Sequence, residues 1–304
     1  MKNLIFLFTF LVSISAVAQK KLVKVNGLNI NVNVIGLEDR EEGQAVIVFE
    51  SGHGVPMDNW DRVLAGVVAL APLVTYERPG IGESEATEEE PTIKNVSDRL
   101  VSILKHLDIP PPYVLVGHSL GGLYVRGFAI HYPELLAGLI IVDPADFTET
   151  HQNKRAYYEV LGWEDAKVDS LMQSFIDRRN ANHLKANPPI RREGQYLEAI
   201  RAREFEEIAE HQLPNIPVHI LTGGRFDVPE RMRSKEYDQE AVFRSKMKYR
   251  TARWMEVVQS VEKGMFFYSG DAGHYVHYDD PELLIASVKL VLSDYELIKG
   301  KNKK

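Results

Sequence analysis

The sequence predicts an α/β fold in which helices cover both faces of a mostly parallel sheet. Three observations favour it: short apolar runs alternate with segments of helical length, an Asn-Gly hairpin precedes them, and one long charged segment interrupts the alternation. The composition agrees, because 44% hydrophobic and 26% charged residues in a chain of 304 are typical of a globular protein with a sizeable core.

The first predicted element is an antiparallel hairpin. Residues 21–25 and 28–35 flank Asn26-Gly27, a strong signal for a two-residue hairpin turn. Buried parallel strands follow, since compact runs rich in Val, Ile and Leu, separated by helical stretches, are typical of βαβ units. With a last strand near 265–268, the hairpin and these runs make eight strands; the runs are 45–49, 73–76, 113–116, 139–142 and 218–221.

Helices occupy the intervals between the strands. We expect them at about 58–70, 93–107, 120–132, 236–261 and 281–297. Residues 147–213 are dense in charge and in helix formers, as in GQYLEAIRAREFEEIAEHQ, and predict a helical cap inserted after the sixth strand. The core then consists of residues 19–146 and 214–304.

The first 18 residues have the pattern of a secretory signal peptide. Lys2 precedes an apolar run of about ten residues, and Ala16-Val17-Ala18 forms an Ala-x-Ala cleavage site. The run is shorter than the roughly 20 residues that a spanning helix needs. We therefore expect cleavage after Ala18 and a soluble periplasmic or secreted protein without integral membrane contact.

Composition excludes several kinds of site. With no Cys, the chain has no disulfide, no thiolate metal site and no cysteine nucleophile. A net charge of −7 gives no basic surface for a nucleic acid. The ten His form no group with metal-ligand spacing, so neither a metal nor another cofactor is expected.

The strongest chemical motif is Gly117-His118-Ser119-Leu120-Gly121. In Gly-x-Ser-x-Gly the serine occupies a strained turn between a strand and a helix, and its hydroxyl is exposed beside the free N–H groups of the helix. Here the motif follows the apolar run YVLV and precedes the helical stretch LGGLYVRGFAIHY, which is the context it requires. Ser119 is thus predicted to be a nucleophile, and His118 is expected to be a packing or surface residue.

These motifs resemble those of α/β-hydrolase fold serine hydrolases over nearly all of the chain after residue 18. The resemblance implies an eight-stranded sheet with a cap, and a reaction through an acyl-enzyme on Ser119. Its other motifs are SGHG, YERPGIGES, IIVDPA, TGGRFDVP and GHYVHYDDPEL, which begin at residues 51, 76, 140, 222 and 273.

The resemblance also implies a base and an acid that activate the serine. The family's chain order is Ser, then acid, then His. This order indicates His274 as the base, with His277 as a rival three residues later. It indicates Asp227 as the acid, because Asp227 follows the fifth parallel strand; Asp143, after the strand before it, is the alternative acid.

Two backbone N–H groups are expected to form the oxyanion hole. The residue after the nucleophile, Leu120, supplies one. By resemblance to the family's His-Gly-x segment, His53 supplies the other, although Ser51 replaces the usual His. Residues 76–80 are expected to brace the loop beside the nucleophile.

The predicted function is hydrolysis of a carboxylic ester of a small or medium molecule. An aminopeptidase, a thioesterase or a lactonase with the same triad is the alternative, because the triad does not select the leaving group. A binding protein that keeps the fold without catalysis is a further alternative. The expected partner is a small-molecule substrate, and the sequence does not indicate an oligomeric state.

Overall fold

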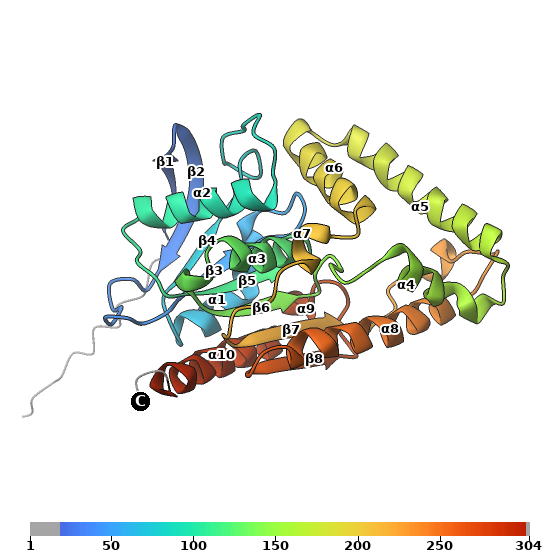
Figure 1. The fold of residues 1–304 in the computed structure, drawn as a ribbon. Coiled ribbons are helices and arrows are strands. Elements are labelled where there is room, and N and C mark those ends of the chain that lie inside the picture. Colours follow the sequence, from blue (N-terminus) through green and yellow to red (C-terminus); the bar gives the residue numbers. More distant parts are fainter. Residues whose placement is uncertain (1–18, 302–304) are drawn as a thin grey trace, which may run out of the picture.

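A computed structural model describes residues 19–301 of the chain. Its sheet has eight strands in the order β1-β2-β4-β3-β5-β6-β7-β8. Strand β2 pairs antiparallel with β1 and with β4, and all pairs from β4 to β8 are parallel. The mostly parallel eight-stranded sheet with flanking helices is confirmed (Figure 1).

The elements follow the predicted order with small changes at their ends. The strands are β1 Gln19–Val25, β2 Leu28–Ile35, β3 Val46–Glu50, β4 Leu73–Tyr76, β5 Tyr113–His118, β6 Leu136–Val142, β7 Val218–Gly223 and β8 Gly264–Ser269. The α-helices are α1 Asp61–Val68, α2 Ile93–His106, α3 Leu120–His131, α4 His151–Arg155, α5 Asp165–Lys185, α6 Pro188–Ala202, α7 Glu206–Ala209, α8 Gln239–Gln259, α9 Val276–Asp279 and α10 Pro281–Lys301. Short 3₁₀ helices are η1 Met57–Trp60, η2 Pro133–Leu135, η3 Ala156–Leu161 and η4 Glu230–Met232.

The hairpin turn has the geometry that its residues predict. Asn26 and Gly27 both have positive φ, at 50° and 88°, as a type I′ turn requires. Val25 therefore pairs with Leu28, and this register continues back to the start of β1, where Gln19 pairs with Val34.

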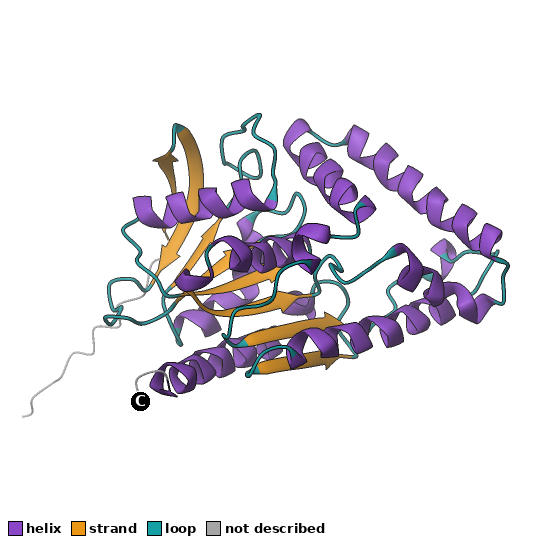
Figure 2. Cartoon of the chain, viewed as in Figure 1, coloured by secondary structure: helices purple, strands orange, loops and turns teal. Residues whose placement is uncertain are grey.

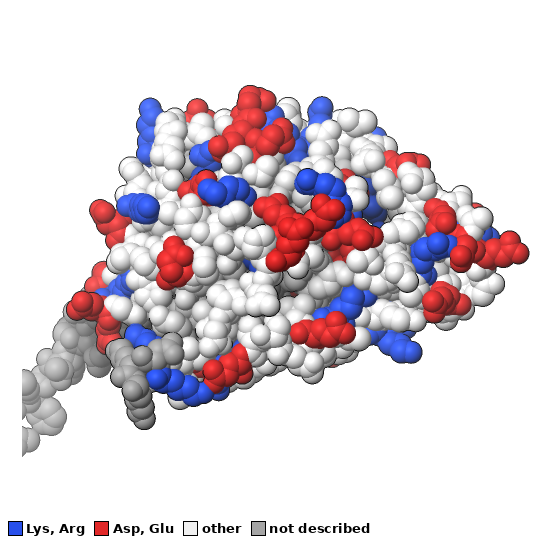
Figure 3. Space-filling model, viewed as in Figure 1, with Lys and Arg blue, Asp and Glu red and all other residues white. Residues whose placement is uncertain are grey.

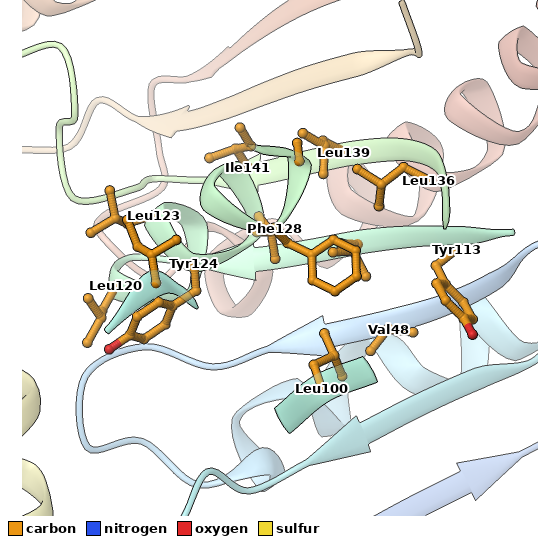
Figure 4. Packing of buried hydrophobic residues seen from close by; sticks show 14 of the residues in the cluster. Val48, Leu100, Tyr113, Leu120, Leu123, Tyr124, Phe128, Leu136, Leu139 and Ile141 are labelled. Carbon is orange, nitrogen blue, oxygen red and sulfur yellow. The ribbon is translucent and has the colours of Figure 1, made fainter. Parts of the chain in front are cut away.

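Two apolar cores cover the two faces of the sheet. Successive side chains of a strand point to opposite faces, so Val48 packs with α2 and α3 while its neighbour Phe49 packs with α1 and α10. Leu100 of α2 and Phe128 of α3 contribute to the first core (Figure 4). Strands β3 to β7 are buried along their whole length, and the carboxyl ends of the parallel strands lie at one edge.

Residues between β6 and β7 form a helical insertion. Helices α4–α7 lie in this interval, and α5 and α6 pack against each other (Figure 2). Helix α8 belongs to the core by sequence, but its first half extends past the sheet and packs on η3 of the insertion. A small apolar cluster around Tyr157, Tyr158, Val168 and Met172 joins the two, with Val242 and Tyr249 of α8 packed against it.

The predicted signal peptide, residues 1–18, lies outside the described residues. Within residues 19–301, no helix combines the length and the apolar character of a membrane span. Acidic and basic side chains are interspersed on the face drawn in Figure 3, and no broad basic area appears on that face.

Candidate active site

The serine of the Gly-x-Ser-x-Gly motif lies at a strained turn between β5 and α3. Ser119 has φ 55° and ψ −115°, a conformation that non-glycine residues rarely adopt. Backbone hydrogen bonds hold it there: its N–H donates to the Val142 carbonyl, and its carbonyl accepts from Ala145 N–H at 2.9 Å. The loop after β6 therefore fixes the turn, and strain of this kind is typical of a functional site.

The two glycines of the motif allow close backbone approach. A Cβ atom on Gly121 would lie 2.1 Å from the Glu50 carbonyl oxygen, and a Cβ atom on Gly117 would lie 2.3 Å from the Gly121 carbonyl oxygen. No side chain fits at either position. The first turn of α3 can thus pack directly against the end of β3.

The structure pairs His274 with Asp143. The Nδ1–H group of His274 donates to Oδ2 of Asp143 at 2.6 Å. His274 lies in the loop between β8 and α9, and Asp143 follows β6 directly, with φ 37°. This bond leaves Nε2 of His274 as the acceptor nitrogen, and Ser119, Asp143 and His274 line the same cavity.

The prediction that Asp227 orients His274 needs correction. The Asp227 carboxylate binds the guanidinium of Arg225 through both oxygens, at 2.7 and 3.0 Å, and its side chain is 54% exposed. Asp227 does lie near the base, since a Cβ atom on Gly273 would lie 2.2 Å from its Oδ2. It contacts the backbone of the His274 loop rather than the imidazole, and the alternative acid, Asp143, has the imidazole contact.

Asp143 remains ionised although it is buried. Its Oδ1 accepts from Thr222 Oγ1 at 2.7 Å and from Arg250 Nη1 at 3.0 Å, which leaves Oδ2 for His274. Burial alone would raise the pKa of the Asp143 carboxyl, but the charge of Arg250 and the hydrogen bonds from His274 and Thr222 hold that pKa well below its usual value. The Asp143 side chain is therefore a carboxylate at neutral pH.

His118 contacts His274 directly, which the sequence did not indicate. Its Nε2–H group donates to the His274 backbone carbonyl at 2.9 Å, and its ring lies 4.6 Å from the His274 ring between centroids. Burial and the neighbouring histidines hold the pKa of His118 well below its usual value. His277, the rival base, is fully buried with its Nε2 against the Asn59 amide. Burial lowers the pKa of His277 to about 3.

The loop after β3 lies against the nucleophile. A Cβ atom on Gly52 would lie 3.5 Å from the Ser119 Cβ, so Gly52 borders the serine. The His53 imidazole donates from Nε2 to the Ile190 carbonyl of α6 at 2.7 Å, which anchors this loop to the insertion. Leu120 is the first residue of α3, and the first N–H groups of a helix have no intrahelical partner.

Arg78 joins this loop to the insertion. Its guanidinium donates to the Ser51 and Gly52 carbonyls, both at 2.7 Å, and forms ion pairs with Glu50 of β3 and Glu193 of α6. Glu193 also accepts from Gly54 N–H at 2.9 Å. The sequence predicted a bracing role for residues 76–80, but Glu193 lies in a charged segment where no pattern distinguishes it from the other charged residues.

A cavity of about 370 Å³ opens at the serine. The core and α8 contribute residues of both charges, and the insertion contributes aromatic and charged residues. The lining is Ser119, Asp143, Pro144, Ala145, Asp146, Glu149, Lys154, Tyr157, Tyr158, Phe175, Arg179, Arg201, Lys246, Arg250 and His274. Such a volume suits a small molecule. Within residues 19–301, no three His, Asp or Glu side chains are grouped as a metal ion would require.

Comparison with known proteins identifies the fold independently. The model of the alpha/beta hydrolase family matches residues 47–287. The uncharacterized protein YqjL of Bacillus subtilis (strain 168) is 24% identical over 244 residues, 78% of this chain and 79% of YqjL. A pimeloyl-[acyl-carrier protein] methyl ester esterase of Hamiltonella defensa is 28% identical over 138 residues, 45% of this chain and 51% of that esterase.

Solved structures show the same fold at low sequence identity. The enol-lactonase from Burkholderia xenovorans LB400 superposes with a TM-score of 0.57 at 16% identity, covering 90% of this chain and all of that one. Naproxen esterase from Bacillus subtilis superposes with a TM-score of 0.54 at 15% identity, covering 90% of each chain.

Proposed function

This chain belongs to the alpha/beta hydrolase family, and from that premise we propose that it is a serine hydrolase that cleaves a carboxylic ester through an acyl-enzyme on Ser119. One observation carries the proposal. A serine in a strained turn opens into the same cavity as a histidine whose Nδ1 is bound to a buried carboxylate at 2.6 Å. Serine, histidine and carboxylate in these roles activate a hydroxyl for acyl transfer.

The reaction follows from the protonation states of the three groups. Nε2 of His274 accepts the Ser119 proton while Oγ attacks the carbonyl carbon of the ester. The bond to the alkoxy group then breaks, and His274 returns the proton to the leaving oxygen. Water repeats the two steps on the acyl-enzyme, which releases the acid and restores Ser119. Asp143 stabilises the imidazolium that forms in each step.

We assign the oxyanion hole to the backbone N–H groups of Leu120 and His53. Leu120 follows Ser119 at the start of α3, and His53 follows Gly52, where a Cβ atom would lie 3.5 Å from the Ser119 Cβ. Each such donor is worth about 10² to 10³ in rate. We further assign the helical insertion, residues 147–213, the role of a cap, since Tyr157, Tyr158 and Phe175 line the cavity of Ser119.

The nucleophile is tested with Ser119→Ala. We expect this variant to lose hydrolysis of 4-nitrophenyl acetate by about 10⁶-fold, as the loss of a catalytic serine does elsewhere, and to lose labelling by a fluorophosphonate. Ser260→Ala is the matched control, because Ser260 is an exposed residue at the end of α8. Labelling that persists in Ser119→Ala would refute the assignment.

The leaving group is tested with a substrate panel. Esters of graded acyl length, lactones, thioesters and p-nitroanilides share the acyl-transfer step and differ in the bond that breaks. An ester hydrolase has its highest kcat/KM on the esters. A higher value on lactones, thioesters or anilides would reassign the enzyme to a lactonase, a thioesterase or an aminopeptidase.

The proposal includes export of the protein by cleavage of residues 1–18. Lys2, the apolar run and Ala16-Val17-Ala18 support it. N-terminal sequencing of protein from a periplasmic extract and from the medium would begin at Gln19. Protein that starts at Met1 in the cytoplasmic fraction would contradict export.

A further inference from the structure

The cavity of Ser119 has an excess of positive charge, although the whole chain has a net charge of −7. Five cationic side chains line it against three carboxylates, an excess of two positive charges. The cations are Lys154, Arg179, Arg201, Lys246 and Arg250, and the carboxylates are Asp143, Asp146 and Glu149. A cleft lined by one sign of charge concentrates ligands of the opposite sign.

Four of these five cations form ion pairs with carboxylates of the protein itself. Arg250 binds Asp143 at 3.0 Å, and Lys154 binds Glu149 at 3.1 Å. Arg179 and Arg201 share the single carboxylate of Glu198, which is itself mostly buried. Asp146 is bound at 2.7 Å by Arg253, which does not line the cavity, and lies 3.8 Å from Arg250.

Lys246 differs from the other four. Among the described residues, no ion pair or side-chain hydrogen bond involves its ammonium group. It lies one turn before Arg250 on α8, it is partly buried, and it lines the cavity. Burial and the charge of Arg250 lower the pKa of Lys246. The charges of Glu149, Asp146 and Asp143 offset this lowering of the pKa only in part. A desolvated ammonium beside another cation is unfavourable unless an anion neutralises it.

We propose that Lys246 binds a carboxylate of the substrate, so that the preferred ester carries a second, free carboxylate group. This inference rests on the proposed function, because it assigns the substrate class of the same cavity. Arg179 and Arg201, which have one shared carboxylate between them, add positive charge on the insertion side. The aromatic walls formed by Tyr157, Tyr158 and Phe175 cover the apolar part of the molecule between the carboxylate and the ester.

Two pairs of probes test the inference and locate the carboxylate. In the first pair, 4-nitrophenyl hydrogen adipate is compared with 4-nitrophenyl methyl adipate, so that the charge lies in the acyl part. In the second, 4-carboxyphenyl acetate is compared with phenyl acetate, so that the charge lies in the leaving group. We expect the wild-type protein to prefer the charged member of at least one pair by roughly 10- to 100-fold in kcat/KM, mainly through KM.

The variant Lys246→Met should remove that preference, and Lys246→Arg should restore most of it. Lys248→Met is the matched control, since Lys248 is an exposed residue on the same helix; it should keep the preference. An equal kcat/KM ratio in the wild-type protein and Lys246→Met, for both pairs, would overturn the inference. Circular dichroism and thermal unfolding confirm that each variant is folded.

A binding measurement separates this inference from the proposed function. Absent fluorophosphonate labelling of the wild-type protein would refute the acyl-enzyme and leave the anion site to be decided by calorimetry. Monomethyl adipate should then bind the wild-type protein at least about tenfold more tightly than it binds Lys246→Met. Equal affinities, or no binding to the wild-type protein at 10 mM (about 3 kcal/mol), would overturn the anion site.

Discussion

Arg78 and Arg250 are two buried arginines with nearly the same set of contacts. Each binds a carboxylate at the carboxyl end of a strand, Glu50 on β3 and Asp143 after β6. Each also donates to backbone carbonyls of the loop that follows that strand. They differ in the second partner of the carboxylate: Glu50 accepts from the Tyr76 hydroxyl, whereas Asp143 has one oxygen bound to a histidine that faces the cavity.

This difference separates a carboxylate with a structural role from one to which we assign a role in catalysis. Arg78 lies between two carboxylates, Glu50 and Glu193, and fastens a loop to the insertion. Arg250 and Thr222 occupy only Oδ1 of Asp143, so that Oδ2 is free to fix the tautomer of His274. Both oxygens of Glu50 are bound by buried structural groups, Arg78 and Tyr76. By contrast, Oδ2 of Asp143 is bound by the imidazole of His274, which faces the cavity.

Among the substitutions that test this difference, the largest expected effect is the loss of activity when Asp143 is replaced. The variant Asp143→Asn should lower kcat/KM by about 10⁴-fold, because an amide cannot hold the Nδ1–H tautomer or stabilise the imidazolium. Glu50→Gln is the matched substitution at the other strand end and should reduce kcat/KM far less. Steady-state kinetics on the best ester measures both. Equal losses would mean that the two carboxylates do not differ in the way the contacts indicate.

The second-largest expected effect is a loss of folding stability when Arg78 is replaced. Arg78→Met leaves Glu50 and Glu193 buried without their cation, which should cost about 3–5 kcal/mol in the free energy of unfolding at pH 8. Arg250→Met should cost less, since Asp143 keeps its hydrogen bonds from Thr222 and His274. Urea unfolding of the three proteins measures this order. A larger loss in Arg250→Met would reverse the comparison.

The loss in Arg78→Met should depend on pH. Burial already raises the pKa of the Glu50 carboxyl in the presence of Arg78. A group whose pKa is raised by folding contributes stability below its unfolded value, about 4.3, and that stability is lost as the pH rises through the folded value. Without Arg78 this pKa rises further, so the variant should be closer to the wild-type protein at pH 5 than at pH 8. A difference that is constant with pH would exclude Glu50 as its source.

The sequence predicted the order of the strands and helices because the signals for these elements are local. The hairpin at Asn26-Gly27, the apolar runs and the strand-to-helix turn at Ser119 each depend on a few neighbouring residues, and each lies where it was expected. The helical segment after β6 was also recognised, since charge density and helix formers are properties of composition.

The carboxylate that contacts His274 could not be chosen from sequence, because each of two strand ends offers one. Asp143 and Asp227 follow adjacent parallel strands, whose carboxyl ends lie at the same edge of the sheet. The choice depends on which arginine meets which carboxylate. Arg225 is two residues from Asp227 and occupies it, whereas Arg250 reaches Asp143 from 107 residues away and leaves one oxygen free. No local pattern reports contacts of that kind.

The smallest expected effect is therefore at the residue that sequence placement favoured. Asp227→Asn removes an exposed ion pair with Arg225, and such pairs contribute about 0–1 kcal/mol to stability. Arg225 keeps its contacts with Asp279 and with the Asp271 carbonyl, so the loop that carries His274 stays in place. We expect kcat/KM of Asp227→Asn to match the wild-type value while Asp143→Asn is nearly inactive. If Asp227→Asn instead lost activity as Asp143→Asn does, the Asp227 carboxylate would be acting on His274. The ion pair between Arg250 and Asp143 would then have a structural role only.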